Sequence, residues 1–382
     1  MGSNNVPDPL MPQVGGSIFH PEEGEFKVLR CLASGPFSDV FKVLHVKNGN
    51  KYAMKVEREE GNIRPVLKLD VYVLTQIKRS GKTTGFPLLV CAGRTNYYKY
   101  AVMQLVGVDL NKLRRSMPDK KFSIGTALKV AHNTLGRIEI LHDMGWLCRD
   151  VKAPNFTIGK GADIGTVYML DFGFARRYKD KNGNMLQPRN AAALLGTIHY
   201  APIASHNNQE QCRRDDLESW LYMIVECTCG TLPWFHMEPM KQHKQIADAK
   251  KFARTGGREA FLTGCPPEYS EIMDLIDSCG FMDRPNYVKM ALLLERVMER
   301  NKVDLHTPFD WEVDNGELIK RAGVIGDLGQ SHMMSARLRE LKQNENDALD
   351  RALLEDPDAR DAPRLDMKMS LSCVNPMEPR LD

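Results

Sequence analysis

Four polar side chains have the types and the spacing that one reaction requires. Asp150, Lys152 and Asn155 lie in the segment 148–155, and Asp171 opens an Asp-Phe-Gly tripeptide after a further turn and strand. Phosphoryl transfer needs a carboxylate that orients the attacking hydroxyl and accepts its proton, and Asp150 is placed for that role. Lys152 would neutralise charge on the transferred group. Asn155 and Asp171 supply the oxygen ligands that Mg²⁺ prefers.

Residues upstream of this segment follow in the order that transfer from a nucleotide needs. Lys55, on the third predicted strand, can reach the α- and β-phosphates and pair with Asp70 on the helix that interrupts the sheet. Before it, a strand–turn–strand with a tip of small residues can lie over the phosphates. This predicted loop comprises Leu32, Ala33, Ser34, Gly35, Pro36, Phe37, Ser38, Asp39 and Val40.

The elements that must hold these residues follow from the pattern of apolar side chains. The chain has 382 residues, 42% of them hydrophobic, which suits one large two-lobed domain or two medium domains. Short β-rich runs come first, two of them joined by an Asn-Gly turn, and apolar residues at helical spacing follow. We predict strands at 26–32, 40–46, 52–56, 88–92 and 100–105, and helices at 65–77, 124–144, 216–229 and 286–299.

These elements predict an α+β fold with two lobes, a small antiparallel sheet with one helix and a larger, mainly α-helical lobe. Both ends of the chain have few core positions, so we expect a flexible leader and a mostly flexible tail with one helix at 335–355. The predicted boundaries are 1–19 for the leader, 20–103 for the N-lobe, 104–107 for the hinge, 108–315 for the C-lobe and 316–382 for the tail.

Charge and cysteine usage narrow the partners and the location. The chain has 52 basic and 49 acidic residues, and a net charge of +3 is too small for a dedicated nucleic-acid or membrane-surface binder. The nine cysteines lack metal-ligand spacing, which indicates reduced thiols inside the cell. We recognise neither a targeting leader nor an apolar stretch of membrane-spanning length. We therefore expect a protein of the cytoplasm or the nucleus, and a monomer.

Two further motifs connect this pattern with a known family. Residues 196–201 are Gly-Thr-Ile-His-Tyr-Ala, and residues 213–219 are Arg-Arg-Asp-Asp-Leu-Glu-Ser, where protein kinases usually carry Ala-Pro-Glu. With the catalytic segment, these motifs make the chain resemble the protein kinases, and within them the casein kinase 1 group. The resemblance covers about residues 20–315. Similarity to the tau-tubulin kinase branch rests on residues 102–105, 109–115, 168–173 and 308–312.

The resemblance implies an enzyme that uses ATP and Mg²⁺ to phosphorylate Ser or Thr hydroxyls of protein substrates. It implies that Asp216 holds the backbone of the catalytic segment, and that Lys152 marks serine/threonine specificity. The residues that it assigns to adenine are Met103 as gatekeeper, Gln104, Leu105 and Val106 as hinge, and Leu32, Val40 and Ala53 around the base.

Several departures from the family pattern bear on the chemistry. Ala33 and Ser38 replace glycines, and Pro36 removes a backbone N–H that would face the phosphates, so we expect a lower nucleotide affinity. Asp70 replaces the usual Glu, and it would reach its lysine partner directly if the helix sits closer, or otherwise through water. Cys148 replaces the usual His and is predicted to be a packing residue.

The primary hypothesis is an active kinase, because these departures spare Lys55, Asp150, Lys152, Asn155 and Asp171. The alternative from a different class is a pseudokinase that serves as a binding scaffold, which the weak phosphate loop favours. A small-molecule kinase of related fold is disfavoured by the long match through the C-lobe.

The segment after the Asp-Phe-Gly tripeptide bears on regulation and substrates. It has no Ser or Thr between residues 174 and 196, which predicts activity without an upstream kinase. Its basic residues favour acidic or already phosphorylated substrates, although they could also be solvated loop charge. His199 replaces an Arg common in casein kinase 1, which argues against a need for phosphorylated substrates. The basic residues are Arg176, Arg177, Lys179, Lys181 and Arg189, with Arg213 and Arg214 on the next helix.

Overall fold

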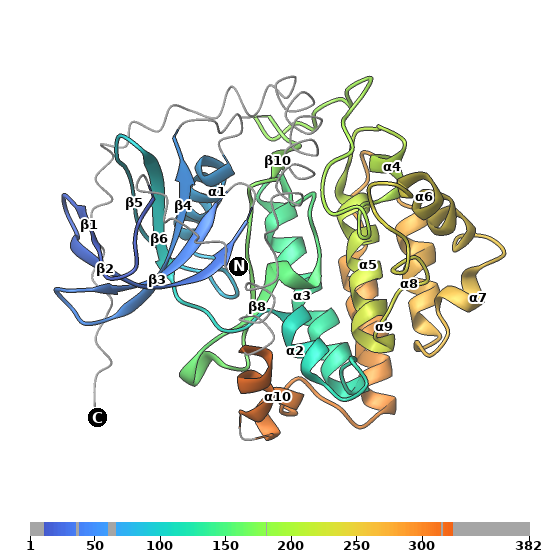
Figure 1. Cartoon of the computed structure of the whole chain (residues 1–382). Coiled ribbons are helices and arrows are strands. Elements are labelled where there is room, and N and C mark those ends of the chain that lie inside the picture. Colours follow the sequence, from blue (N-terminus) through green and yellow to red (C-terminus); the bar gives the residue numbers. More distant parts are fainter. Residues whose placement is uncertain (1–10, 36–37, 60–65, 181, 315, 324–382) are drawn as a thin grey trace, which may run out of the picture.

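The first lobe is an antiparallel sheet of six strands in the part of the chain that the structure describes (Figure 1). The computed structural model describes residues 11–35, 38–59, 66–180, 182–314 and 316–323. The strands are β1 (Ser17–His20), β2 (Gly24–Ser34), β3 (Asp39–His45), β4 (Lys51–Arg58), β5 (Leu89–Arg94) and β6 (Tyr98–Gln104). Their order is β1-β2-β3-β4-β6-β5, with every neighbouring pair antiparallel.

Alternating apolar side chains close a core on one face of this sheet. Phe26, Val43 and Met54, from three neighbouring strands, are fully buried in one cluster. Between β3 and β4, Gly49 has φ of +71°, a conformation that glycine adopts without a steric penalty. In the same turn, the backbone N–H of Asn50 donates to Asn48 Oδ1 at 2.9 Å. The predicted hairpin is therefore confirmed.

One helix, α1 (Val66–Ser80), covers the sheet by packing against β4, β5 and β6. Its buried face includes Val66, Val73 and Ile77, at the helical spacing seen in the sequence. The same face carries Asp70, whose residue surface is only 2% exposed. A buried carboxylate needs partners, and those of Asp70 lie in the site described below.

The second lobe is helical and is built around α5 (Arg213–Cys229), which is buried along most of its length. The long helix α3 (Ile124–Asp143) packs against α5 and against α9 (Tyr287–Arg300), as Figure 1 shows. These three helices match the predicted ones. The lobe also contains the helices α2 (Leu110–Ser116), α4 (Ile203–His206), α6 (His243–Phe252), α7 (Arg258–Phe261), α8 (Glu268–Asp277) and α10 (Asp310–Val313).

Short elements where the two lobes meet carry the residues of the catalytic segment. They are the pair β7 (Trp146–Leu147) and β10 (Arg176–Arg177), the pair β8 (Phe156–Ile158) and β9 (Val167–Met169), and the 3₁₀ turns Ala153–Asn155 and Gly161–Asp163. The predicted fold class, two lobes with an antiparallel sheet and a mainly helical part, is confirmed.

The structure differs from the predicted boundaries at both ends of the domain. Met11 is buried against the sheet and β1 pairs with β2, so residues from 11 onward belong to the first lobe rather than to a leader that ends at residue 19. Only a few apolar residues make this contact, and the polar composition concealed them. At the other end, Leu318 and Ala322 are buried beyond residue 315. The predicted helix at 335–355 lies outside the described residues.

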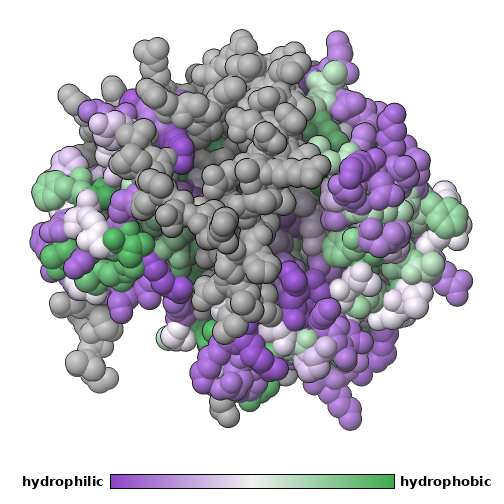
Figure 2. Space-filling view, in the orientation of Figure 1, coloured by the Kyte–Doolittle hydropathy of each residue, from purple (hydrophilic) through white to green (hydrophobic). Residues whose placement is uncertain are grey.

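The surface shows where apolar side chains reach solvent. In Figure 2, hydrophobic residues gather over the outer strands of the first lobe, while hydrophilic residues cover much of the helical lobe. Phe19 and Val46 are among the exposed large apolar residues of the first lobe. In the described part of the chain, every helix is too short or too polar to cross a membrane.

Candidate active site

A cleft of about 720 Å³ lies between the lobes and collects most of the predicted nucleotide-binding residues. Asp39 does not line it, and its carboxylate accepts a hydrogen bond from Ser34 Oγ at 2.5 Å. Pro36 and Phe37 lie outside the described residues. The predicted residues that line the cleft are Leu32, Ala33, Ser34, Gly35, Ser38, Val40, Ala53, Lys55, Asp70, Met103, Gln104, Leu105, Asn155 and Asp171.

Lys55 on β4 and Asp70 on α1 form a direct ion pair in this cleft, with 2.5 Å between Nζ and Oδ2. The other oxygen of Asp70 accepts the backbone N–H of Phe172 at 2.6 Å. Burial disfavours the charged form of Lys55, but Asp171 and Asp70 outweigh it and raise the pKa of the ammonium above its usual value. Of the two predicted arrangements, the direct pair is present, and one carboxylate connects the sheet, α1 and the Asp-Phe-Gly segment.

Asp171 faces the same ammonium group from the other lobe. Its Oδ1 lies 3.2 Å from Lys55 Nζ and accepts the backbone N–H of Gly173 at 3.2 Å. Burial alone would raise the pKa of this carboxyl, but Lys55 and Lys152 hold it below its usual range. Its φ of +62° is unusual for a residue other than glycine, and such backbone strain clusters at functional sites. The carboxylate is therefore ionised and fixed in direction.

Asp150 is held by three neighbours that leave its carboxylate a single orientation. Oδ2 lies 2.6 Å from Lys152 Nζ and accepts the Asn155 amide at 3.2 Å. Oδ1 accepts both the backbone N–H and the hydroxyl of Thr197, each at 2.9 Å. Lys152 also donates to the Thr197 hydroxyl at 2.7 Å. Gly196 permits this approach, because a Cβ there would lie 2.7 Å from the Arg149 carbonyl oxygen.

The backbone before Asp150 is fixed by Asp216, at the start of α5. Its carboxylate accepts the N–H groups of Cys148 and Arg149, both at 2.7 Å. His142 lies 2.8 Å from the same carboxylate and 2.6 Å from the Tyr287 hydroxyl. Arg149 has φ of +64°, which these contacts sustain. Cys148 is fully buried, and burial raises the pKa of its thiol, as suits a packing residue.

Comparison with known proteins identifies this arrangement. The protein kinase domain family matches residues 26–291 of the chain. The chain belongs to the protein kinase family. It is 49% identical over 342 residues to the serine/threonine-protein kinase spe-6 of Caenorhabditis elegans, with 89% of each chain covered. It is 34% identical over 304 residues to a probable serine/threonine-protein kinase of Dictyostelium discoideum, which covers 79% of this kinase and 59% of that protein.

Members of the family use ATP and Mg²⁺, and the oxygen donors of this kinase fit a magnesium ion. The Asn155 amide nitrogen donates to the Asp150 carbonyl at 2.9 Å as well as to its carboxylate, which leaves the amide oxygen for a cation. Asp171 supplies an ionised carboxylate in the same cleft. The described residues contain no cluster of three His, Cys, Asp or Glu side chains that could hold a metal by itself. Phosphate oxygens would therefore complete the coordination.

The sequence pattern did not predict several residues of the site in this kinase. Thr197 lies in a motif that identified the family, but its two hydrogen bonds to Asp150 depend on the approach of segments 47 residues apart. His142 has no motif, and only its burial beside Asp216 reveals its role. Ile319 and Ala322 line the cleft from beyond the predicted domain boundary. Each of these contacts is long-range, and no local sequence signal marks it.

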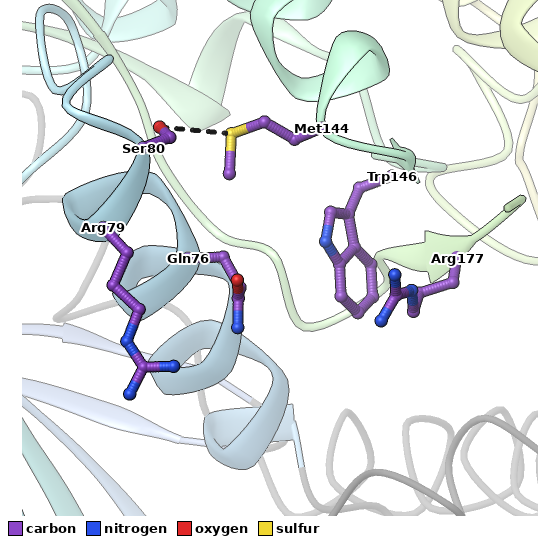
Figure 3. A pocket seen from close by; sticks show the side chains of 6 residues that line it. All are labelled: Gln76, Arg79, Ser80, Met144, Trp146 and Arg177. Atoms are coloured by element: carbon purple, nitrogen blue, oxygen red, sulfur yellow. Dashed lines mark hydrogen bonds between the residues drawn. The ribbon is translucent and has the colours of Figure 1, made fainter. Parts of the chain in front are cut away.

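A second hollow of about 360 Å³ lies apart from this cleft, between the end of α1 and the β7–β10 pair (Figure 3). None of the sequence-predicted catalytic or nucleotide-binding residues lines it. Across it, Ser80 Oγ lies 3.9 Å from the Met144 sulfur, and the Arg177 guanidinium stacks 5.6 Å from the Trp146 ring centre. The lining residues are Gln76, Arg79, Ser80, Met144, Trp146 and Arg177.

Proposed function

We propose that this kinase transfers the γ-phosphoryl group of ATP to Ser or Thr hydroxyls of protein substrates. The observation that carries the proposal is the fixed orientation of Asp150 beside Lys152 and Thr197. Asp150 also contacts Asn155, which lines the same cleft as Asp171 and Lys55. In this proposal Asp150 accepts the proton of the attacking hydroxyl, and Lys152 stabilises the negative charge that develops on the transferred group. Mg²⁺, when held by Asn155 and Asp171, would shield the charge of the phosphates.

The proposed position of ATP follows from two backbone N–H groups, one at each end of the hinge, that already donate hydrogen bonds within the protein. The Gln104 N–H donates to the Leu88 carbonyl at 2.8 Å, and the Gly107 N–H donates to the Ile158 carbonyl at 2.7 Å. Adenine would therefore bind the backbone between these two anchors, at Leu105 and its neighbour. Met103, Leu32, Val40 and Ala53 would enclose the base, and Lys55 would reach the phosphates.

Labelled ATP tests this function most directly. The full chain is incubated with labelled ATP, Mg²⁺ and a general protein substrate, and label on serine, threonine and tyrosine is separated after hydrolysis. We expect label on serine or threonine, and loss of nearly all of it in Asp171→Ala. A signal no greater than that of the variant would instead support the pseudokinase scaffold, which the substitutions at Ala33 and Ser38 favour. Label on tyrosine would contradict the specificity assigned to Lys152.

We also propose a preference for acidic or phosphorylated substrates, which fewer basic residues support than the sequence pattern indicated. Arg176 and Arg189 both pair with Glu210, at 3.4 Å for Arg176, and Arg213 donates to the Met282 carbonyl at 2.9 Å. Burial lowers the pKa of His199, which leaves that side chain neutral. The preference is supported by Arg177 and Lys179, both partly exposed. A peptide panel that shows no gain from acidic or phosphorylated residues would contradict it.

Finer placements rest on the same sequence pattern. We propose membership of the casein kinase 1 group and its tau-tubulin kinase branch, on the motifs quoted above. We also propose a monomer of the cytoplasm or the nucleus, without nucleic-acid or membrane partners. The eight cysteines in the described ranges are all free thiols, which supports an intracellular location. Gel filtration of the full chain and imaging of a tagged protein test these two proposals.

A further inference from the structure

Two cysteines far from the cleft lie within reach of one another. Cys229 is the last residue of α5, and Cys265 lies in the segment between α7 and α8. Their sulfur atoms are 3.3 Å apart, and both side chains are partly exposed. Gly264, the residue before Cys265, adopts φ of +82°, a backbone conformation that glycine takes without a steric penalty. The two segments thus present a pair of accessible thiols.

This pair differs from every other cysteine in the described residues. The buried ones are Cys91, Cys148, Cys212, Cys227 and Cys279, and burial raises the pKa of each thiol. Cys31 is partly exposed, but its sulfur contacts only a backbone carbonyl, at 3.4 Å. Accessible thiols with a second thiol in contact form disulfides most readily.

The surroundings of the pair favour the thiolate on one side. The contact with Cys265 lowers the pKa of Cys229, burial opposes this effect, and the charge of Lys121 adds to it. The same contact raises the pKa of Cys265. Because the thiolate is the nucleophile, Cys229 is the sulfur that reacts first and Cys265 the one that resolves.

We propose that Cys229 and Cys265 are an oxidative modification site that a hydroperoxide converts reversibly into a disulfide. The Cys229 thiolate attacks one peroxide oxygen, the O–O bond breaks, and the departing hydroxide takes a proton to become water. Cys265 then attacks the resulting sulfenic acid, loses its proton and displaces a second water. Two thiols and one hydrogen peroxide thus give one disulfide and two waters, and a dithiol reductant reverses the change.

The fold accommodates this bond with a small movement. A disulfide requires about 2.05 Å between the sulfur atoms, so the observed contact must close by little more than one ångström. The bond would join the C-terminal end of α5 to the segment that precedes α8. Asp216 lies at the opposite end of α5. The site therefore lies apart from the catalytic residues, and its chemistry is independent of phosphotransfer.

Peptide mass spectrometry of the full chain tests the proposal. The reduced protein is treated with hydrogen peroxide, alkylated and digested without reductant. We expect a crosslinked peptide pair that contains Cys229 and Cys265, which disappears after dithiothreitol. Cys31→Ser serves as the matched control and should form the crosslink like the parent. In Cys265→Ser, Cys229 lacks its resolving partner, so we expect sulfenic and sulfinic acid at Cys229.

Two outcomes would overturn the proposal. One is complete alkylation of both cysteines after an exposure to peroxide that oxidises Cys31. The other is a crosslink that joins Cys229 to a different cysteine. A second measurement does not depend on the variants folding. Because the disulfide closes a loop of about 36 residues, the melting temperature of the oxidised parent should rise by about 5 °C and return after reduction; an unchanged or lower melting temperature argues against the bond.

Discussion

Replacement of Asp70 by asparagine tests how far one carboxylate organises the cleft. Asp70 uses one oxygen for Lys55, at 2.5 Å, and the other for the backbone N–H of Phe172, at 2.6 Å. Asparagine has a single oxygen acceptor, so it can keep one of these contacts but not both. Its amide nitrogen would then face either the Lys55 ammonium or the N–H group, and both are donors.

The loss can be estimated from the contact that must break. A hydrogen bond to a charged group contributes about 1.5–3 kcal/mol, which corresponds to a fall of about 10- to 150-fold in kcat/KM. We expect this fall for Asp70→Asn when ATP is varied at a fixed protein substrate concentration. Asp119→Asn, the same change at an exposed site, should leave the rate unchanged. Melting temperatures measured in parallel separate loss of catalysis from loss of the fold.

Two further variants decide whether the pair acts as a unit. Asp70→Glu restores the charge but adds a methylene to a buried position, so we expect activity between that of the parent and that of Asp70→Asn. Lys55→Met combined with Asp70→Asn should lose little more than Lys55→Met alone, because the lysine needs the carboxylate to hold its position. A rate for Asp70→Asn within about twofold of the parent would refute the reasoning, as would losses that simply multiply in the double variant.

Three other predictions concern the segment that precedes α4 and its support. Lys250→Met should raise KM for the protein substrate more than KM for ATP in steady-state assays. The reason is that the buried amine of Lys250 donates at 2.7 Å to the backbone carbonyls of Ile198 and Ala201. Equal changes in the two KM values would contradict the prediction. Glu210→Gln should lower the free energy of unfolding by about 1.5–3 kcal/mol in denaturant titrations, because Arg176 and Arg189 lose their ion pairs with this carboxylate. It should also reduce the activity of bacterially expressed protein, and stability equal to the parent would count against the prediction. Burial lowers the pKa of His206 to about 3, so between about pH 3 and pH 6.5 the unfolded chain binds more protons than the folded one. The free energy of unfolding therefore falls as the pH drops through that window. His206→Gln should reduce this dependence of stability on pH, and an unchanged dependence would exclude His206 as its source.

The parts of the site that the sequence predicted are those whose chemistry is local. Asn155 and Asp171 lie in the cleft because short motifs carry both the residue and the turn that presents it. The pair of Lys55 and Asp70 followed from their places on a strand and a helix, and only its directness needed the structure. These residues are brought to one cleft, while their catalytic roles stay predictions that the variants above test.

The parts that the sequence did not predict depend on tertiary contact. His142 supports Asp216 from a helix more than seventy residues away, and no spacing rule reports such a pair. Met11 and β1 extend the first lobe through only a few apolar residues. Because the composition of this segment is mostly polar, it predicts a flexible leader instead. Ile319 reaches the cleft from beyond the last recognisable motif. Local sequence patterns thus predict the residues that carry the chemistry, whereas tertiary packing determines which residues hold them in place.

The charges around the catalytic segment show why counting basic residues overstates a substrate-binding surface. Glu210 pairs with both Arg176 and Arg189, and so supplies an anion inside the segment that joins the Asp-Phe-Gly tripeptide to α5. A phosphate on this segment would serve the same purpose, but residues 174–196 offer no serine or threonine to carry one. The carboxylate of Glu210 therefore holds two arginines of this segment without a phosphorylated serine or threonine between residues 174 and 196. Arginines used in this way are unavailable to a substrate, so among the described residues of this segment Arg177 and Lys179 are the basic side chains that remain for an acidic peptide.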